Sequence, residues 1–234
     1  MIPLKDENPT RTTPFVVILL IAVNVAVFLY NGELRPGFQN PLAGFELVPY
    51  KIVTGRNVGP TPIAPWMTIF TSIFMHANVL HLGGNMLYLW IFGNNIEDVL
   101  GHFRFLVFYL AAGVVAAFAQ IIVAPFSTIP MVGASGAIAG VLGAYFLLFP
   151  TARIITLVFM FFIQVVDMPA SFVLGLWIVL QVISLSFMDA SAGGVAYAAH
   201  VGGFVAGVLM ILLLGGRRLL RGRRPYRYYR YYYM

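Results

Sequence analysis

Long apolar stretches separated by short polar ones run through most of the chain. Their length matches the roughly 20 mostly apolar residues that a helix needs to cross the hydrocarbon core of a bilayer. The pattern therefore predicts an all-α membrane protein with six transmembrane helices. Their expected limits are residues 15–30, 66–92, 103–123, 135–149, 169–187 and 194–214.

Three segments interrupt this pattern. Residues 31–64 are rich in proline and glycine and predict a long first loop. The second apolar region is expected to open with a short helix and to break at His76-Ala77-Asn78, where the asparagine can cap the helix that follows. Residues 153–168 are apolar but carry Gln164 and Asp167, so we expect a partly embedded connection there.

The composition is typical of a membrane protein. Of the 234 residues, 60% are hydrophobic and 9% are charged, whereas a soluble domain carries about 25% charged residues. One membrane domain, residues 14–215, is the simplest division, with an N-terminal segment of residues 1–13 and a tail of residues 216–234. The first apolar run lacks a small-residue cleavage site, so we expect a retained helix. The absence of cysteine excludes disulfides, a thiol nucleophile and cysteine-ligated metals.

Positive charge is concentrated after the last apolar stretch. The formal net charge is +6, and the tail holds seven arginines interleaved with tyrosines. Six spans place both ends of the chain on one side, and a cytoplasmic location gives eleven Lys and Arg inside against three outside. We therefore expect cytoplasmic termini and a tail that rests on anionic lipid headgroups. Binding of nucleic acid by the tail is disfavoured, because its arginines follow directly on a span.

Two polar side chains stand at the starts of predicted helices. Ser135 lies in Gly133-Ala134-Ser135-Gly136, and His200 lies in Ala199-His200-Val201-Gly202-Gly203. Polar groups are costly inside a bilayer and are therefore candidates for function. A hydroxyl and an imidazole that meet between two helices predict a serine nucleophile activated by a histidine base.

A second polar pair, His81 and Asn85, is one helical turn apart and so shares one helix face. In the predicted orientation, His81, Ser135 and His200 all lie at a similar depth near the outer surface. Donors from His81, Asn85 and the Ser135 backbone N–H could then stabilise an oxyanion. The alternative is that the pair joins helices by hydrogen bonds, but its shared depth with Ser135 and His200 favours a functional role.

Glycines accompany both candidate catalytic groups. Small residues spaced four apart let the backbones of two helices approach closely. The serine side chain is short, so its hydroxyl reaches an imidazole on another helix only where the two helices nearly touch. The glycines expected to support this contact are Gly133, Gly136, Gly140, Gly203 and Gly207.

Other catalytic patterns fit less well. His76 and His81 are five residues apart and lack the glutamate of an H-E-x-x-H zinc site. No phosphate-binding or dinucleotide-binding motif is present, so no metal or cofactor is expected. No carboxylate is obviously placed to orient His200, because Asp189 is expected in an outer loop and Asp167 on the inner side. The sequence therefore predicts a Ser–His dyad, with His76 either in a structural role or supporting the site residues near the break.

These residues resemble a known family, the bacterial-type rhomboid intramembrane serine proteases. The resemblance covers the chain from about Trp66 to Gly207. It rests on His76-Ala77-Asn78-Val79-Leu80-His81-Leu82-Gly83-Gly84-Asn85, the Gly93-to-Gly101 connection with Glu97-Asp98, Gly133-Ala134-Ser135-Gly136, and Ala199-His200-Val201-Gly202-Gly203.

The resemblance implies a rhomboid-like six-helix bundle with a long, partly embedded first loop. It implies that Ser135 is the nucleophile, that His200 is the general base, and that His81, Asn85 and the Ser135 N–H form the oxyanion site. It also implies a water-filled cavity open to the outer side. Substrates would be transmembrane proteins cut in or near their membrane segment, with the helix at residues 169–187 as a lateral gate.

Two positions depart from the family's pattern. Some members carry an aromatic residue one turn after the nucleophile, where it stacks under the catalytic histidine, whereas this chain has Ala139. The Trp-Arg pair that some members carry in the first loop is absent from residues 31–64. Neither departure removes a proposed catalytic group.

The sequence therefore predicts an intramembrane serine endopeptidase in the bacterial plasma membrane. An alternative is an inactive rhomboid-like protein that binds transmembrane helices as a chaperone or sorting factor. The presence of both Ser135 and His200 favours the enzyme. A channel or transporter is a third reading, but it would require more charged groups within the spans than this chain has.

Overall fold

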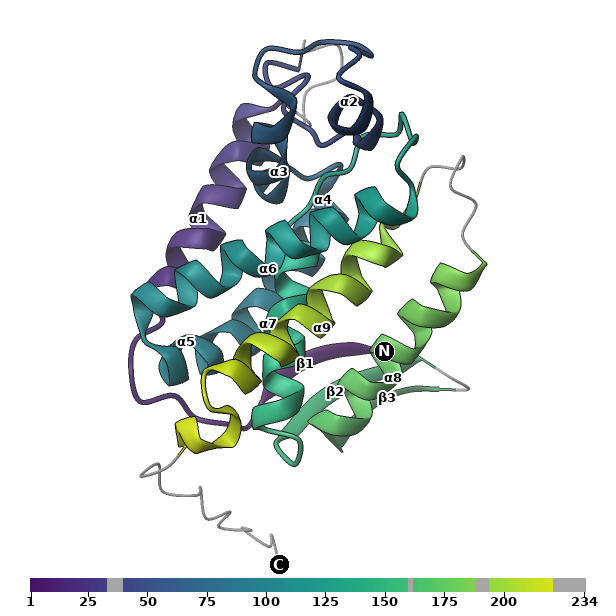
Figure 1. Cartoon of the computed structure of the whole chain (residues 1–234). Helices are drawn as coiled ribbons and strands as arrows, with labels where there is room; N and C mark the ends of the chain where they lie inside the picture. Colours follow the sequence, from purple (N-terminus) through teal and green to yellow (C-terminus); the bar gives the residue numbers. More distant parts are fainter. Residues whose placement is uncertain (33–39, 160–161, 188–193, 221–234) are drawn as a thin grey trace, which may run out of the picture.

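Six helical segments form the bundle of the computed structural model, which describes residues 1–32, 40–159, 162–187 and 194–220. They are α1 (Phe15–Tyr30), α4 (Val79–Tyr88), α6 (His102–Val123), α7 (Ser135–Leu148), α8 (Ala170–Ser186) and α9 (Tyr197–Leu213). The helix α4 continues through a π-helical turn (Leu89–Gly93) into α5 (Asn94–Leu100). Helix α7 packs against both α6 and α9 (Figure 1), and most of its residues are buried.

Helices α1, α6, α7, α8 and α9 match the expected segments to within three residues, whereas the helical stretch that begins with α4 continues to Leu100, beyond the expected end at residue 92. Among the described residues, α6 is the one helix that is by itself both long and apolar enough to cross a bilayer, with 22 residues. Helices α1, α7, α8 and α9 are also apolar but shorter. The predicted break at His76-Ala77-Asn78 is confirmed, because α4 begins at Val79 and the Asn78 side chain accepts a hydrogen bond of 2.9 Å from the His81 N–H.

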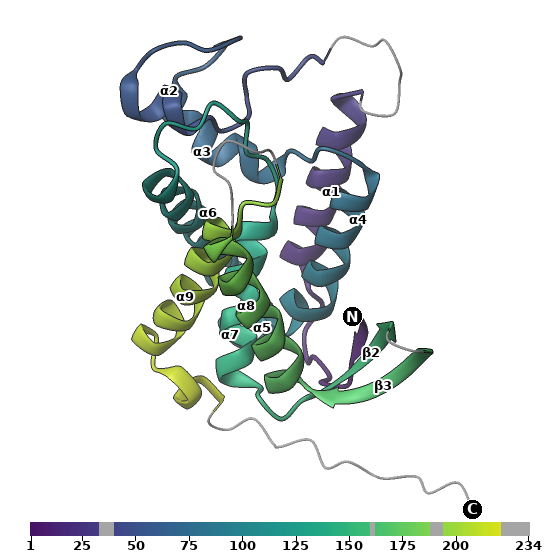
Figure 2. The same ribbon diagram turned by 90° about the vertical axis from the view of Figure 1, so that its right-hand side faces the viewer.

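The first loop folds over one end of the bundle (Figure 2). Its described part contains α2 (Pro49–Thr54), and the chain then forms a 3-10 turn (Pro65–Met67), α3 (Thr68–Thr71) and a second 3-10 turn (Ser72–Phe74). An isolated bridge joins Leu47 to Met131. Leu47 is buried in a small apolar cluster with Ile69 and Ile121, which attaches the loop to α6.

A three-stranded antiparallel sheet at the other end contradicts the purely helical prediction. The strands are β1 (Ile2–Asp6), β2 (Arg153–Phe159) and β3 (Ile163–Pro169), in the order β1-β2-β3. The connection expected at residues 153–168 is a β-hairpin. This segment is rich in β-branched residues, which favour strands, and the N-terminal segment supplies the third strand. Ile154 and Thr156 of β2 are fully buried.

Two acidic residues of α5 hold the chain that leads into α1. The Glu97 carboxylate accepts hydrogen bonds from the N–H groups of Val16 (2.9 Å) and Val17 (2.8 Å). It thus satisfies backbone donors at a helix N-terminus, where negative charge is favourable. Asp98 accepts from the Arg11 N–H and from the N–H and hydroxyl of Thr12. The N-terminal segment is therefore fixed to the bundle by side chains that are distant in sequence.

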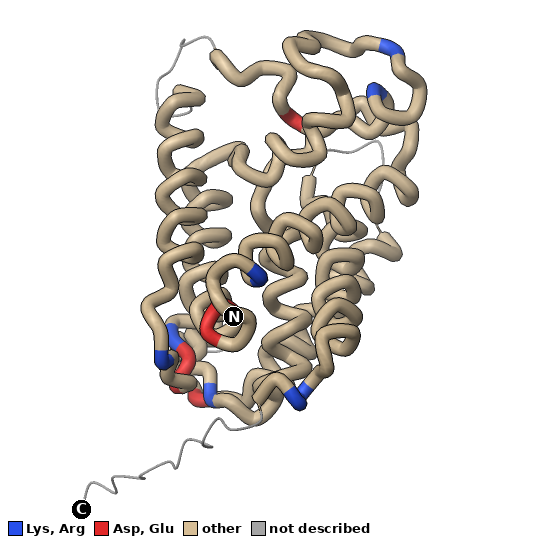
Figure 3. Tube along the Cα trace, turned by 60° about the vertical axis from the view of Figure 1, so that its left-hand side comes forward, with Lys and Arg blue, Asp and Glu red and all other residues tan. Residues whose placement is uncertain are grey.

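Charged residues lie toward the two ends of the molecule, and the helical turns between these ends carry almost none (Figure 3). Lys51 and Arg56 belong to the end formed by the first loop, whereas Lys5, Arg11 and Arg153 belong to the end with the sheet. This distribution suits a bundle whose middle is surrounded by lipid, because charge is costly there. The arginine-rich part of the tail after residue 220 lies outside the described residues.

The glycines of α7 and α9 allow direct contact between the two helix backbones. A Cβ atom added to Gly203 would collide with the carbonyl oxygen of Gly136, and one added to Gly207 would collide with that of Gly140. At these four glycines the two backbones approach too closely to leave room for a side chain. This approach places the first turn of α7 directly beside the first turns of α9.

Replacement of Gly207 by alanine is expected to destabilise the bundle. The new methyl group would meet the carbonyl oxygen, carbonyl carbon and Cα of Gly140, and overpacking of this kind costs about 1–3 kcal/mol or more. Thermal unfolding in detergent measures the effect. Gly83→Ala is the matched control, because a Cβ there meets nothing within 4 Å and a helical Gly→Ala change alone stabilises by about 0.5–1 kcal/mol. Equal melting temperatures for the two variants would contradict the tight contact.

Asp6 is expected to make stability depend on pH. Burial raises the pKa of its carboxyl from 3.8 to about 6, although hydrogen bonds from Tyr145 and Asn95 oppose the shift. The folded state therefore favours the protonated acid, and the resulting stability is present below pH 4 and lost as the pH rises through 6. A shift of this size corresponds to at most about 3 kcal/mol.

The variant Asp6→Asn tests this dependence, because an amide oxygen can still accept the hydrogen bonds from Asn95 (2.7 Å) and Tyr145 (3.0 Å). Unfolding in detergent is measured from pH 4 to pH 8. We expect the wild type to lose stability across this range and the variant to lose much less. The control Glu7→Gln alters the neighbouring carboxylate and should keep the wild-type slope. A wild-type slope in Asp6→Asn would refute the assignment.

Candidate functional site

A hollow of about 730 Å³ opens among the N-terminal turns of α4, α7 and α9. All three helices begin toward the end that carries the first loop, so their first turns lie at a similar level (Figures 1 and 2). His81, Asn85, Ser135 and His200 all line this hollow. The structure therefore brings together the four polar side chains that the sequence singled out from three separate segments.

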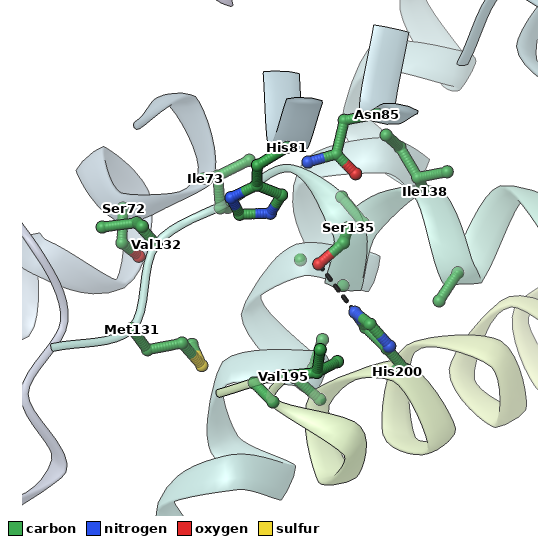
Figure 4. A pocket seen from close by; sticks show the side chains of 18 of the residues that line it. Ser72, Ile73, His81, Asn85, Met131, Val132, Ser135, Ile138, Val195 and His200 are labelled. Atoms are coloured by element: carbon green, nitrogen blue, oxygen red, sulfur yellow. Dashed lines mark hydrogen bonds between the residues drawn. The ribbon is translucent and has the colours of Figure 1, made fainter. Parts of the chain in front are cut away.

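Ser135 and His200 are in direct contact. The Ser135 hydroxyl oxygen lies 2.8 Å from Nε2 of His200 (Figure 4), although 65 residues separate the two. Ser135 is the first residue of α7, so the N–H groups of this turn have no partner one turn earlier in the helix. The close approach of α7 and α9 at Gly136 and Gly203 makes this contact possible for so short a side chain.

His81 and Asn85 lie on the opposite side of Ser135 from His200 (Figure 4). The Asn85 side-chain nitrogen is buried and finds no hydrogen-bond acceptor among the described residues. Nδ1 of His81 lies 3.5 Å from the Ala77 N–H, which leaves Nε2 as the nitrogen that can carry a proton. Two side-chain donors and a helix N-terminus thus converge on one side of the serine, and a base lies on the other.

Gly133 makes room for the His81 ring. Its φ is +130°, and a Cβ there would lie 2.8 Å from Nε2 of His81. The strain of this backbone for other residues and the nearby ring both require glycine, so Gly133 supports the site rather than the helix contact for which it was expected. His76 is buried behind His81, with its ring edge-on at a centroid distance of 5.1 Å, as suits a structural residue.

Sequence reasoning missed Gln181 and Trp177, both on α8. Oε1 of Gln181 lies 2.7 Å from Nδ1 of His200. The Trp177 ring lies over the same imidazole, with centroids 5.7 Å apart and planes inclined at 35°. The one available signal was the position of Gln181, a single amide in an otherwise strongly apolar helix.

The sequence also drew attention to two aspartates, to possible metal ligands and to Ala139. Asp167 pairs with Arg153 at 2.8 Å in the sheet, and Asp189 lies outside the described residues. No cluster of three or more histidine, aspartate or glutamate side chains in the described part of the chain could hold a metal ion. Ala139 is fully buried beside Gly203 in the contact between α7 and α9.

Comparisons with known proteins agree with the motifs. The family model of the rhomboid domain matches residues 64–217, which include every polar residue of the hollow. The chain belongs to the rhomboid family. The rhomboid protease GluP of Bacillus subtilis is 32% identical, with 93% of this chain and 41% of GluP covered. Rhomboid protein 1, mitochondrial, of Saccharomyces cerevisiae is 31% identical, with 82% of this chain and 51% of that protein covered.

Human presenilin-associated rhomboid-like protein, mitochondrial, is a third relative, 29% identical with 66% of this chain and 39% of that protein covered. The chain thus spans about half the length of these relatives or less. Rhomboid proteins are integral membrane proteins, which agrees with the apolar helices of this chain. The relatives include bacterial and mitochondrial proteins, and the region matched by the rhomboid family model contains the residues that line the hollow.

Proposed function

We propose that this rhomboid protein is an intramembrane serine endopeptidase with Ser135 as its nucleophile and His200 as its general base. The observation that carries the proposal is the 2.8 Å contact between the Ser135 hydroxyl and Nε2 of His200. A serine hydroxyl is a weak nucleophile until a neighbouring base accepts its proton. Both residues line a hollow, and relatives of the chain are named as proteases.

The reaction begins when Ser135 Oγ attacks the carbonyl carbon of a substrate peptide bond. Nε2 of His200 takes the hydroxyl proton and then gives it to the leaving amine as the C–N bond breaks. The acyl group stays on Ser135 as an ester. A water molecule, deprotonated by the same nitrogen, attacks this ester and releases the second product, and the proton returns to the serine. Neither step requires a cofactor.

The negative charge on the attacked carbonyl oxygen needs donors on the side away from His200. The buried Asn85 side-chain N–H, Nε2 of His81 and the Ser135 backbone N–H are suitably arranged around the serine. Donors held in place before the reaction stabilise an oxyanion strongly in a site of low dielectric constant. We assign these three groups to the oxyanion site.

The substrates we propose are transmembrane proteins, cut in or near their membrane segment. Helix α8 has exposed apolar residues along its length and few buried ones, which supports its role as the gate through which a substrate helix approaches. The composite helix that starts with α4 supplies the sixth span beside α1, α6, α7, α8 and α9. We also propose that the protein lies in a bacterial plasma membrane with both termini on the cytoplasmic side, at the end that carries the sheet. The tail would then rest on anionic lipid.

A fluorophosphonate probe tests the proposal, because it reacts covalently with an activated serine. We expect labelling of the wild type, none of Ser135→Ala, and at least about a thousandfold slower labelling of His200→Ala. The controls Ser186→Ala and His102→Gln change a serine and a histidine outside the hollow and should leave the labelling rate unchanged. A wild type that is neither labelled nor able to cut any model transmembrane substrate would instead favour the helix-binding alternative.

Asn85→Ala is expected to lower kcat about 100-fold with little change in KM, because loss of one oxyanion donor acts on the transition state alone. Cleavage of a transmembrane substrate reconstituted in liposomes measures both constants. The control Asn24→Ala removes another buried asparagine, which lies on α1 and bonds only within its own helix in the described structure. A higher KM with an unchanged kcat in Asn85→Ala would contradict the assigned role.

A further inference from the structure

We propose that α8 completes the catalytic site, with Gln181 as a positioning residue that holds the His200 imidazole in its reactive tautomer. This inference rests on the proposed protease function. Gln181 contacts neither the nucleophile nor, in our assignment, the reacting atoms of the substrate. It acts through Nδ1 of His200, where its Oε1 lies at 2.7 Å.

The chemistry of a neutral imidazole explains why this contact matters. One ring nitrogen carries a proton and the other accepts, and general-base catalysis requires that Nε2, at 2.8 Å from the Ser135 hydroxyl, be the acceptor. The proton must therefore reside on Nδ1. An oxygen acceptor at Nδ1 stabilises that tautomer, and the amide oxygen of Gln181 is such an acceptor. In serine proteases that use a carboxylate, the third group has the same orienting role.

The Trp177 ring limits movement of the His200 imidazole out of its own plane. Two hydrogen bonds, one at each nitrogen, fix the ring within its own plane. Trp177 covers one face and also packs against Phe204, one turn further along α9. Trp177 and Gln181 are four residues apart and so lie on one face of α8. A single helix face thus provides both the acceptor and the aromatic cover.

The contacts of Gln181 and Trp177 with His200 depend on how α8 is attached to the bundle. Its buried residues are Ala170, Val173 and Leu174, all within its first five positions. The second half, which carries Gln181, has largely exposed apolar neighbours such as Leu180 and Val182. Movement of this half away from α9 would break the hydrogen bond to His200 and uncover the ring. The histidine is therefore oriented for catalysis only while α8 is seated against α9.

Three variants test the role of Gln181. Gln181→Leu keeps the size of the side chain and removes the acceptor, and we expect kcat to fall about 10- to 100-fold with KM within about twofold of wild type. Gln181→Glu keeps an oxygen acceptor and should restore kcat to within a few-fold of wild type. Gln120→Leu removes a buried glutamine of α6 outside the hollow and should leave both constants unchanged.

The same ranking is expected for the rate of labelling by a small fluorophosphonate, which does not require a substrate helix to pass α8. Thermal unfolding in detergent shows whether each variant is folded. If the wild type is labelled and Gln181→Leu is labelled equally fast, or if Gln181→Glu is as slow as Gln181→Leu, the positioning role is refuted while the protease function stands. A wild type without labelling or cleavage refutes the protease function itself, and the inference with it.

Discussion

The contact between the backbones of α7 and α9 is the constraint on which the proposed site depends. At Gly136 with Gly203, and at Gly140 with Gly207, the two helices approach so closely that a methyl group would collide with a carbonyl oxygen. In lipid there is little hydrophobic force to bring helices together, so small residues and dispersion contacts must do so. The serine hydroxyl extends only one atom beyond its Cβ. Without this approach of the backbones, Nε2 of His200 would lie beyond hydrogen-bonding range of Ser135.

The other polar groups follow from the same cost of burial in an apolar medium. A donor without an acceptor costs free energy in such a site, yet the Asn85 side-chain nitrogen lacks a partner among the described residues. If His81 and Asn85 only joined helices, their polar atoms would be expected to have hydrogen-bond partners within the bundle. An unsatisfied donor in the hollow that the nucleophile also lines instead suits a group whose partner arrives with the substrate, as the charge on an attacked carbonyl does.

The sequence predicted the parts of the fold that local patterns determine, and it failed where distant segments meet. The helix limits, the Asn78 cap and the glycine contacts follow from runs of apolar residues, a capping side chain and four-residue spacing. The strand β2 was misread because its isoleucines and valine suit a bilayer and a sheet equally well, and the partner strand β1 lies about 150 residues away. The three residues that the sequence placed at a similar depth, His81, Ser135 and His200, line one hollow with Asn85, while their catalytic roles stay predictions.

Gln181 and Ala139 show why the environment of His200 could not be predicted from motifs. Some family members carry an aromatic residue one turn after the nucleophile, where this chain has Ala139 on α7. The sequence also offers no carboxylate that is obviously placed to orient His200 on α9. The structure supplies equivalent restraints from α8, with Trp177 over the ring and an amide oxygen at Nδ1. Nothing in the spacing of residues 177 and 181 relative to residue 200 reveals this, since it depends on how α8 packs against α9. An imidazole needs an acceptor and a surface to be held in one orientation, and the fold can provide both from whichever helix lies beside it.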